Sequence, residues 1–488
     1  MNTAIRRLSV LIAALFGALL VASTVIQFAQ AGSMNRMAAN KRTLLDNYGQ
    51  ERGSILVGGQ AIAKSVEVDD QYQWLRTYPE GRLYSQITGF YAYSVGNPFG
   101  LENAADELLS GKADRLFVRR VTDLVTGRET AGATIELTIN PKAQQAASQG
   151  LGKNRGAVVA LDPTTGAILA MVSHPQYDPN PLSSHDLDEA ATAWEKLSTN
   201  SAKPFINRAI TGDLYPPGST FKVVTAAAAL EQGIVADENS RVPGPAELDL
   251  PLTDTPLPNE TRQPCGPNDQ TTLIHALEIS CNTAFASLGL ELGGKQLRDQ
   301  AGKFGFGLDS IKIPMRVSPS TIPAEMNEPQ AAQSAIGQYE VRTTPLQMAM
   351  VAAGIANQGR VMTPYLIQTI RTADLDVIED TPEPEELSQA VSPRTADILK
   401  RMMVSVVDNG SGRRAQIPGV AVGGKTGTAQ HDLDKDPHAW FISFAPADDP
   451  KVAVAVVVEE SGVTGNEVGG AAVAAPIAKD VMEAVIGR

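Results

Sequence analysis

The sequence predicts an α/β fold in which helices flank one antiparallel sheet. Two apolar, β-rich runs at residues 157–162 (AVVALD) and 167–173 (AILAMVS) are separated by a Pro-Thr-Thr-Gly turn signal. The stretch that follows is long and largely helical in pattern. Because strands reappear only near the C-terminus, the sheet must combine strands from distant parts of the chain. These later strands are expected at residues 421–430, 439–447 and 451–460.

The first element of the chain is an apolar segment at residues 8–29, preceded by Arg6 and Arg7. Its length is about that needed to cross the hydrocarbon core of a membrane. We therefore expect a transmembrane anchor after a cytoplasmic tail of residues 1–7. The alternative is a cleaved signal peptide, because residues 29–31 (AQA) resemble a cleavage site, although the apolar part of such peptides is usually only about 7–15 residues long. In both cases the arginine pair keeps the N-terminus in the cytoplasm and sends the remaining chain out.

A separate small module is expected at residues 30–145, ahead of a catalytic domain at residues 146–488. The module has short apolar runs, tyrosine-rich segments and glycine-containing turns. Roughly one hundred residues are too few for a second large enzyme domain. We therefore expect a non-catalytic spacer and docking platform.

Several helices are predicted in the middle and at the end of the chain. Residues 221–231 (FKVVTAAAALE) are apolar on all sides, which indicates a helix buried in a core. The Pro-Pro-Gly sequence before Ser219 places this serine at the start of that helix. The acidic, proline-rich residues 374–386 predict a surface loop. Further helices are expected at residues 273–292, 345–357 and 471–486.

The composition excludes several classes of function. The net charge of −13 argues against nucleic acid, whose phosphates require a basic surface. Two cysteines and five histidines, without H-E-x-x-H or C-x-x-C spacing, do not form a metal-ligand pattern. We expect no metal and no cofactor.

The two cysteines, Cys265 and Cys281, both follow the predicted anchor. Disulfides persist in oxidising compartments, so an exported chain favours a bridge between them. Closing such a loop would add about 3 kcal/mol of stability in the chain-entropy model. Two buried free thiols are the alternative.

The first candidate catalytic pair is Ser219 and Lys222, in an S-x-x-K tetrad. Residues three apart on a helix share a face. A serine hydroxyl is a weak nucleophile unless a base lies within hydrogen-bond reach, and a lysine serves as base when burial and nearby cations favour its neutral form. Alone, the tetrad is a weak signal.

Two further motifs strengthen this interpretation. An S-x-N triplet (SCN) occupies residues 280–282, and a K-T-G-T sequence occupies residues 425–428 on a strand-like segment. S-x-x-K, S-D-N and K-T-G, in this order, are the known signature of penicillin-binding proteins and serine β-lactamases. Here Cys281 replaces the aspartate of S-D-N.

The resemblance to penicillin-binding proteins extends well beyond these motifs. Residues 156–181, 336–364 and 437–460 resemble the transpeptidase domain, and residues 51–55 (ERGSI) resemble the R-G-x-I element that opens the N-terminal module of the class B members. The short module and the K-T-G-T-A-Q sequence are most similar to the actinobacterial A-type members. The resemblance implies an antiparallel sheet flanked by helices, a helical subdomain and a smaller α+β module.

The resemblance also implies a reaction and its catalytic groups. Ser219 would attack the carbonyl between the two terminal D-alanines of a peptidoglycan stem peptide, with Lys222 as general base. Ser280 would relay the proton to the leaving nitrogen. Asn282 would hydrogen-bond the donor peptide and Lys222.

The resemblance also implies roles for the residues of the third motif, K-T-G-T. Lys425 would supply positive potential beside Ser219, and Thr426, Gly427 and Thr428 would bind the substrate, the threonines through its terminal carboxylate. The oxyanion hole would consist of the backbone N–H groups of Ser219 and Thr428, each such donor being worth on the order of 3 kcal/mol.

The implied partners are peptidoglycan stem peptides, β-lactam antibiotics, the membrane, and proteins of cell division or elongation. A D,D-carboxypeptidase, a β-lactamase and a β-lactam-binding sensor are alternatives on the same fold. A serine β-lactamase normally lacks an N-terminal module, so the module expected here favours the transpeptidase. Only seven residues precede the predicted anchor, which argues against a signalling sensor.

Two unrelated enzyme classes also need consideration. Residues 419–426 (GVAVGGKT) formally match a phosphate-binding loop, but the polar sequence that follows does not predict the required helix. A Ser-His-Asp hydrolase would need a catalytic histidine, and no G-x-S-x-G elbow is present. Of the five histidines, His438 deserves most notice because it follows the K-T-G strand.

Arg52, in the E-R-G-S-I sequence, is expected to have a structural role. It would fix the module against the catalytic domain through carboxylates. Contact with a partner protein is the alternative.

Overall fold

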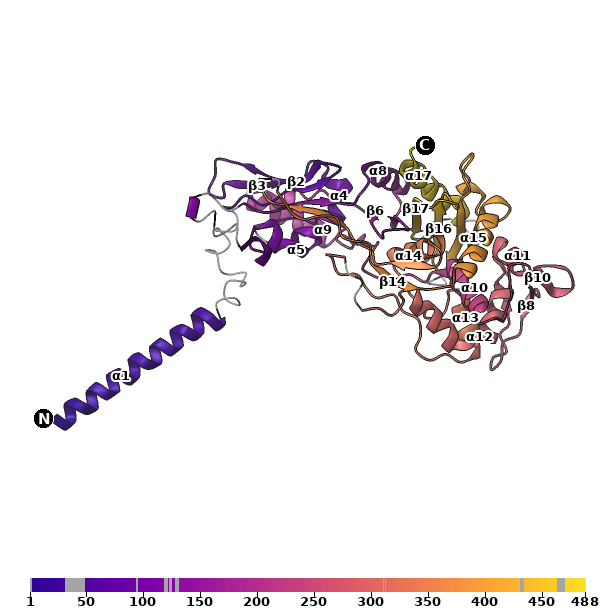
Figure 1. The fold of residues 1–488 in the computed structure, drawn as a ribbon, viewed down its shortest axis with the longest axis horizontal. Coiled ribbons are helices and arrows are strands. Elements are labelled where there is room, and N and C mark those ends of the chain that lie inside the picture. The colour runs from indigo at the N-terminus through magenta and orange to yellow at the C-terminus, as the bar shows by residue number, and fades with distance from the viewer. Residues whose placement is uncertain are drawn as a thin grey trace.

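The computed structural model describes residues 2–30, 49–93, 95–117, 122, 125–127, 131–309, 311, 313–374, 376–430, 434–462 and 470–488. Figure 1 shows three parts along the long axis of the molecule. Helix α1 (Asn2–Thr24) stands at one end, a small module lies in the middle, and a larger α/β domain forms the other end.

Helix α1 continues as the π-helical turn η1 (Val25–Gln30). Its span Ile5–Phe28 has a mean hydropathy of 2.5, and none of its most apolar window is buried. Among the described residues it is the one helix long and apolar enough to cross a membrane. This agrees with the anchor expected at residues 8–29.

A six-stranded sheet forms the centre of the module, in the order β13-β12-β4-β1-β2-β3. Strands β1 and β4 run parallel, and the other neighbouring pairs are antiparallel. The short helices α4, α5 and α6 pack in the same module, which is therefore α+β. The bounds are β1 (Ile55–Val57), β2 (Gln60–Glu67), β3 (Trp74–Thr77), α4 (Gly81–Thr88), α5 (Gly100–Ala104), α6 (Asp106–Leu109), β4 (Thr134–Leu137), β12 (Ile367–Arg371) and β13 (Val377–Glu379).

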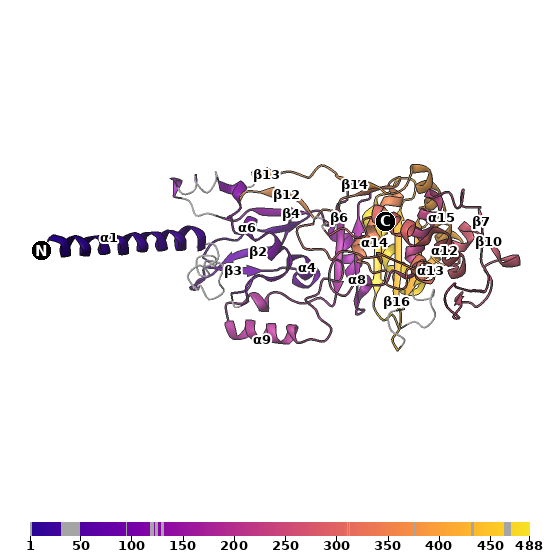
Figure 2. The same cartoon turned by 90° about the horizontal axis from the view of Figure 1, so that it is seen from below.

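Two strands of this sheet come from much later in the chain than the other four. Figure 2 shows β12 and β13 beside β4, at the end of the molecule that carries α1. The surface loop predicted at residues 374–386 is therefore wrong in part, because β13 pairs with β12 and the segment ends at β14 (Glu386–Gln389), which pairs with β11 (Arg360–Met362). These strands have three or four residues each, too few to show alternation among acidic residues and prolines.

Arg52 is buried inside the module. Its Nε donates a hydrogen bond to Glu102 Oε2 (2.6 Å), and Nε of Arg76 donates to Glu102 Oε1 (2.7 Å). Arg52 Nη1 also lies 2.8 Å from Oδ1 of Asp106. These contacts support a structural role through carboxylates, but the expectation that Arg52 fixes the module against the catalytic domain is wrong, since both carboxylates lie in the module.

The larger domain contains the predicted antiparallel sheet, with five strands in the order β15-β16-β17-β5-β6. Strand β17 pairs with β5, so that Val456 lies opposite Val158. The expectation that strands from both ends of the domain share one sheet is confirmed. The bounds are β5 (Gly156–Leu161), β6 (Ile168–His174), β15 (Gly423–Ala429), β16 (His438–Ala445) and β17 (Val452–Val458).

Helices cover both faces of this sheet. Val454 and Val456 of β17 pack in one apolar core with α8 (Pro141–Leu151) and α17 (Ala475–Ile486), while Ala453 and Ala455 face a second core with α10 (Lys222–Glu231) and α14 (Pro345–Ala356). Successive side chains of a strand point to opposite faces. This alternation explains why every residue of β15, β16 and β17 is buried.

A helical subdomain lies beside the sheet, at the end of the molecule farthest from α1 (Figure 1). The helices predicted at residues 221–231, 345–357 and 471–486 correspond to α10, α14 and α17. The bounds of the remaining helices and strands are α9 (Leu187–Ser198), β7 (Arg241–Pro243), β8 (Glu247–Leu248), β9 (Leu257–Pro258), β10 (Gln270–Thr272), α11 (Leu273–Glu278), α12 (Asn282–Lys303), α13 (Glu328–Ala335) and α15 (Pro393–Asp408).

Candidate active site

Ser219 lies in a 3₁₀ turn, Gly218–Phe221, that leads directly into α10. Its side chain lines a cleft of about 460 Å³ between the sheet and the helical subdomain. Trp440 of β16 donates a hydrogen bond from Nε1 to the carbonyl of Pro216 (3.1 Å), which holds the approach to the serine against the sheet. The predicted position of Ser219 at a helix start is confirmed.

Two glycines allow the chain to pack tightly around this turn. Gly218 has φ +53°, and a Cβ there would lie 2.4 Å from the carbonyl oxygen of Thr428. At Gly337, with φ +73°, a Cβ would lie 2.1 Å from the carbonyl oxygen of Gly218. A side chain at either position would push the serine turn away from β15.

Lys222 is fully buried one helical turn after Ser219. Its Nζ donates hydrogen bonds to the carbonyl oxygen of Ser280 (2.7 Å), to Ser280 Oγ (3.1 Å) and to Asn282 Oδ1 (2.7 Å). The first two motifs, about sixty positions apart in sequence, thus meet through one amine. All three acceptors are uncharged oxygens.

The Ser280–Asn282 triplet interrupts what the sequence predicted as one helix at residues 273–292. Helix α11 ends at Glu278, Ser280 adopts φ +59°, and α12 begins at Asn282 with Cys281 as its N-cap. The prediction of a continuous helix is wrong. The apolar spacing carries on across the break, so it did not reveal that the triplet is a turn.

Lys425 completes the cluster from strand β15. Its Nζ donates to Ser280 Oγ (2.8 Å) and to the carbonyl oxygen of Thr426 (2.9 Å). The Thr426 hydroxyl in turn lies 2.6 Å from Oγ of Ser411, in the turn after α15. Lys222 and Lys425, both buried, therefore share the hydroxyl of Ser280.

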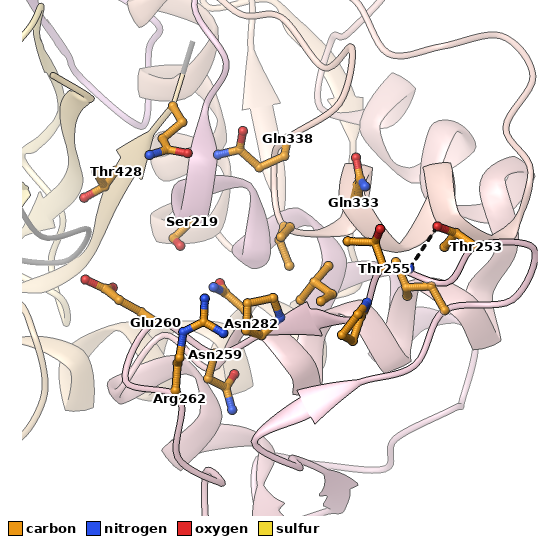
Figure 3. A pocket seen from close by; sticks show the side chains of 16 residues that line it. Ser219, Thr253, Thr255, Asn259, Glu260, Arg262, Asn282, Gln333, Gln338 and Thr428 are labelled. Carbon is orange, nitrogen blue, oxygen red and sulfur yellow. Dashed lines mark hydrogen bonds between the residues drawn. The ribbon is translucent and has the colours of Figure 1, made fainter. Parts of the chain in front are cut away.

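Thr428 faces the cleft together with Ser219 and Asn282 (Figure 3). Its Oγ1 is buried and has no hydrogen-bond partner among the residues that the structure describes. A buried hydroxyl without a partner is costly unless a ligand or water satisfies it. Position and chemistry make Thr428 a donor for an anionic or carbonyl group placed in the cleft.

Cys265 and Cys281 are joined by a disulfide. The bridge connects the middle residue of the S-x-N triplet to the segment that follows β9. The bridge expected from the sequence is thus present, and the alternative of two free thiols is wrong.

The structure gives the histidines no catalytic arrangement with Ser219 among the described residues. His438 lies at the start of β16 with its ring 5.4 Å from that of Tyr215, and His174 ends β6. His431 falls outside the described residues. The described residues contain no group of three or more His, Cys, Asp or Glu side chains that could hold a metal ion.

The phosphate-loop alternative at residues 419–426 is excluded by the local structure. A phosphate loop must lead from a strand into a helix. Here the glycine-lysine-threonine sequence lies inside β15, where Lys425 pairs with Ile442 of the antiparallel neighbour β16. Among the described residues that follow, the next element is the strand β16 and not a helix.

Several cleft residues carried no sequence signal. Asn259, Glu260 and Arg262 follow β9, and Gln333 and Gln338 flank the end of α13. None belongs to a short motif, and they approach Ser219 only because the helical subdomain folds over the sheet.

Two models of known protein families match this chain. The penicillin binding protein transpeptidase domain matches residues 156–483, and the penicillin binding protein A dimerisation domain matches residues 52–135. The chain belongs to the penicillin-binding protein transpeptidases. The first match includes all three motifs, and the second includes Arg52.

Named relatives extend this assignment over the full chain. The peptidoglycan D,D-transpeptidase PbpA of Mycolicibacterium smegmatis is 44% identical, covering 100% of this chain and 99% of the relative. PbpA of Mycobacterium tuberculosis is 42% identical with the same coverage.

Solved structures give the same picture. Penicillin-binding protein A from M. tuberculosis, as its ceftriaxone acyl-enzyme complex, matches with a TM-score of 0.86 and 42% identity over 91% of this chain and 100% of that chain. A D,D-transpeptidase domain from Eggerthella lenta matches with a TM-score of 0.76 and 33% identity over 90% of this chain. The recognition of a class B penicillin-binding protein is confirmed.

Proposed function

We propose that this protein is a peptidoglycan D,D-transpeptidase that forms an acyl-enzyme at Ser219. The observation that carries the proposal is the meeting of Lys222, Ser280, Asn282 and Lys425 in one buried hydrogen-bond network beneath the serine turn. Relatives of 42–44% identity bear the name peptidoglycan D,D-transpeptidase.

In the acylation step, Ser219 Oγ attacks the carbonyl carbon between two terminal D-alanines, and Lys222 accepts the hydroxyl proton. Collapse of the tetrahedral intermediate breaks the C–N bond and releases D-alanine. The leaving nitrogen receives a proton through Ser280, whose hydroxyl already bonds both lysines. Two ammonium groups this close would repel each other, which supports a state in which one amine is neutral and can act as base.

The substrate is held by groups on both sides of the cleft. Asn282 orients Lys222 and the donor peptide from the helical side. Thr426, Gly427 and Thr428 bind the donor from β15, and the free Thr428 hydroxyl suits the terminal carboxylate. The backbone N–H groups of Ser219 and Thr428 form the oxyanion hole, a role that the close packing of Gly218 on Thr428 supports.

In the second step, an amine of a neighbouring stem attacks the ester carbonyl carbon, the bond between this carbon and Ser219 Oγ breaks, a new amide forms, and a proton from the amine returns to Ser219 Oγ. A D,D-carboxypeptidase would use water instead, and a β-lactam sensor would stop at the acyl-enzyme. Incubation with a thioester donor and a D-amino acid separates the three: exchanged product supports the transpeptidase, free acid alone a carboxypeptidase, and a stable adduct a sensor.

The proposal includes the location of the enzyme. Residues 8–29 anchor the chain as one membrane-spanning helix, residues 1–7 remain in the cytoplasm, and the cleft faces the extracytoplasmic cell wall. The module at residues 30–145, with β12 and β13 added from the domain at residues 146–488, serves as a spacer and a docking platform for division or elongation proteins.

The decisive experiment identifies the nucleophile. Full-length protein in detergent is treated with benzylpenicillin and its intact mass is measured. The wild type and a Ser198→Ala control, altered at an exposed serine of α9, should each gain the mass of one penicillin, whereas Ser219→Ala should gain none. A penicilloyl adduct on Ser219→Ala would place the nucleophile elsewhere and reject the assignment.

A further inference from the structure

Ser411, in the turn after α15, contacts the catalytic cluster although it belongs to none of the three motifs. Its Oγ lies 2.6 Å from Oγ1 of Thr426, the second residue of K-T-G-T. Thr426 is fully buried, and Ser411 is half-buried. Within the described residues, the cleft lining includes Thr428 but neither Thr426 nor Ser411. Ser411 therefore reaches the catalytic cluster from outside the cleft, through Thr426.

The backbone of Ser411 is attached to the segment that carries the second motif. Its N–H donates to the carbonyl oxygen of Glu278 (3.1 Å), the last residue of α11, and Ser280 follows two residues later. The N–H of Gly412 donates to the carbonyl oxygen of Val406 in α15 (2.9 Å), which holds the other side of the turn. Ser411 thus connects the segment before the S-x-N triplet to the strand that carries K-T-G-T.

The direction of the hydrogen bond between Ser411 and Thr426 follows from Lys425. Lys425 Nζ donates to Ser280 Oγ (2.8 Å), to the carbonyl oxygen of Thr426 (2.9 Å) and to Thr426 Oγ1 (3.4 Å). An ammonium group donates hydrogen bonds and accepts none. When Lys425 is charged, Thr426 Oγ1 therefore accepts from it, and the hydrogen of the Thr426 hydroxyl donates to Ser411 Oγ.

This direction makes Ser411 favour the charged form of Lys425. A hydroxyl that donates one hydrogen bond accepts another more strongly, because hydrogen bonds in a chain polarise one another. With Ser411 as its acceptor, the Thr426 hydroxyl keeps its lone pairs toward the ammonium. Without the Ser411 hydroxyl, Thr426 loses this orientation and binds the ammonium less well.

We infer that Ser411 is a positioning residue that keeps the positive charge on Lys425 and so leaves Lys222 neutral as the general base. The inference rests on the proposed function, in which Lys222 accepts the proton of Ser219. Lys222 and Lys425 both donate to the Ser280 hydroxyl, so a charge stabilised on one amine opposes a charge on the other. Ser411 acts on this balance without touching the substrate.

The other charged groups of the neighbouring elements have partners or solvent outside this network. Glu278 of α11 lies with Oε2 2.9 Å from Nδ1 of His275. Asp408 and Arg413, on either side of the turn that contains Ser411, are exposed. The two lysines are therefore the titratable groups whose charge Ser411 should affect most.

The rate of acylation by benzylpenicillin, measured over a range of pH with full-length protein in detergent, tests the inference. The active form has a neutral Lys222 and a charged Lys425, and it arises from the doubly charged form as the pH rises. Lys425 is charged in both forms, so Ser411→Ala should leave the acid limb of the rate profile unchanged. The alkaline limb should move down by about one pH unit, because Lys425 loses its proton more easily. On that limb the rate should therefore fall about tenfold.

Ser148→Ala is the matched control, because it removes another half-buried serine hydroxyl from the same domain. Ser148 lies on α8, which covers the face of the sheet opposite to α10. This variant should keep the wild-type profile. Because Ser411 acts through Thr426, the shift of the alkaline limb should disappear when Ser411→Ala is combined with Thr426→Val.

Three results would overturn the inference: an unchanged profile in Ser411→Ala, an equal fall in rate at every pH, or the same shift in the Thr426→Val background. An equal fall at every pH would assign a purely structural role to Ser411. All three results would leave the proposed function intact, since that depends on the penicillin adduct at Ser219, which each of these variants should still form.

Discussion

Two buried polar clusters in this molecule differ in their charges: one combines opposite charges, and the other contains two lysines. In the module, one carboxylate, Glu102, accepts hydrogen bonds from Arg52 and Arg76. Burial raises the pKa of Glu102, but the two guanidinium groups outweigh it and hold this pKa below its usual value. In the catalytic domain, Lys222 and Lys425 are both fully buried and bond uncharged oxygens.

The difference shows which cluster supports the fold and which supports chemistry. Opposite charges that satisfy each other inside a protein resist change, and removing one partner is costly. Lys222 and Lys425 share one hydroxyl acceptor, that of Ser280, and two charged amines so close together would repel each other. A proton transfer away from one amine would remove this repulsion, which suits a cluster that carries out chemistry. Four substitutions test this contrast.

The largest effect is expected for Lys222→Met. Removing the base should slow acylation by benzylpenicillin by about 10²- to 10⁴-fold, the usual contribution of general base catalysis. Because a buried amine is lost next to another, the free energy of unfolding should stay constant or rise. Stopped-flow acylation and urea unfolding measure the two quantities, with the exposed Lys153→Met as control. A large loss of stability with fast acylation would contradict the contrast.

Glu102→Gln should have the reverse pattern. Two buried guanidinium groups lose their shared carboxylate, so we expect a loss of about 3–5 kcal/mol in the free energy of unfolding. Acylation of the protein that remains folded should keep its rate, since Glu102 lies in the module. Thermal unfolding and acylation kinetics check this, and Glu107→Gln, an exposed neighbour, is the control. Slow acylation by folded Glu102→Gln would mean that the module acts on the active site.

Cys265→Ser tests how far the catalytic cluster depends on the disulfide between Cys265 and Cys281. The disulfide closes a loop with a sequence separation of 16, for which the chain-entropy model gives about 3 kcal/mol. We expect this loss in the unfolding free energy, with slower acylation because Cys281 lies between Ser280 and Asn282. Treating the wild type with a reductant should reproduce both changes. Unchanged unfolding in both cases would show that the bridge does not constrain the cleft.

Much of this fold was predictable from sequence because its signals are local or carried by motifs. The valine-rich strands, the buried helix after Ser219 and the apolar N-terminal helix each follow from periodicity and composition. The three motifs, taken in order, selected the residues that meet in the buried network. Each of these inferences needed only the residue types and their spacing.

What escaped prediction depends on contacts between distant segments. The apolar pattern continues regularly across Ser280, so it does not reveal the turn there. The turn depends on the left-handed backbone of Ser280 (φ +59°), which only the tertiary structure explains. The partners of Arg52 lie about fifty positions away in the module. Strands β12 and β13 join a sheet whose other members precede them by more than two hundred residues.

The smallest effect is expected at Glu459, a half-buried carboxylate that directly follows β17. Burial raises its pKa, but hydrogen bonds from the Tyr215 hydroxyl (2.7 Å) and Arg208 Nε (2.7 Å) hold the pKa of Glu459 below its ordinary value of 4.5. A carboxyl whose pKa is lowered by folding stabilises the protein above its unfolded-state pKa, and this stability is lost as the pH falls through the folded-state value.

Tyr215→Phe removes one of these bonds, so the pKa of Glu459 should move up toward its ordinary value. At pH 7 the variant should be about 1.5 kcal/mol less stable than the wild type, as expected for a hydrogen bond to a charged group. The difference should shrink as the pH falls below 4.5, where the wild type loses the stability that the variant already lacks. Urea unfolding at several pH values measures this difference in stability.

Tyr339→Phe is the control, because the Tyr339 hydroxyl has no hydrogen bond to any residue described in the structure. This variant should show no such pH dependence. A pH-independent loss of stability in Tyr215→Phe would assign its effect to packing on Trp440 instead of to the carboxylate.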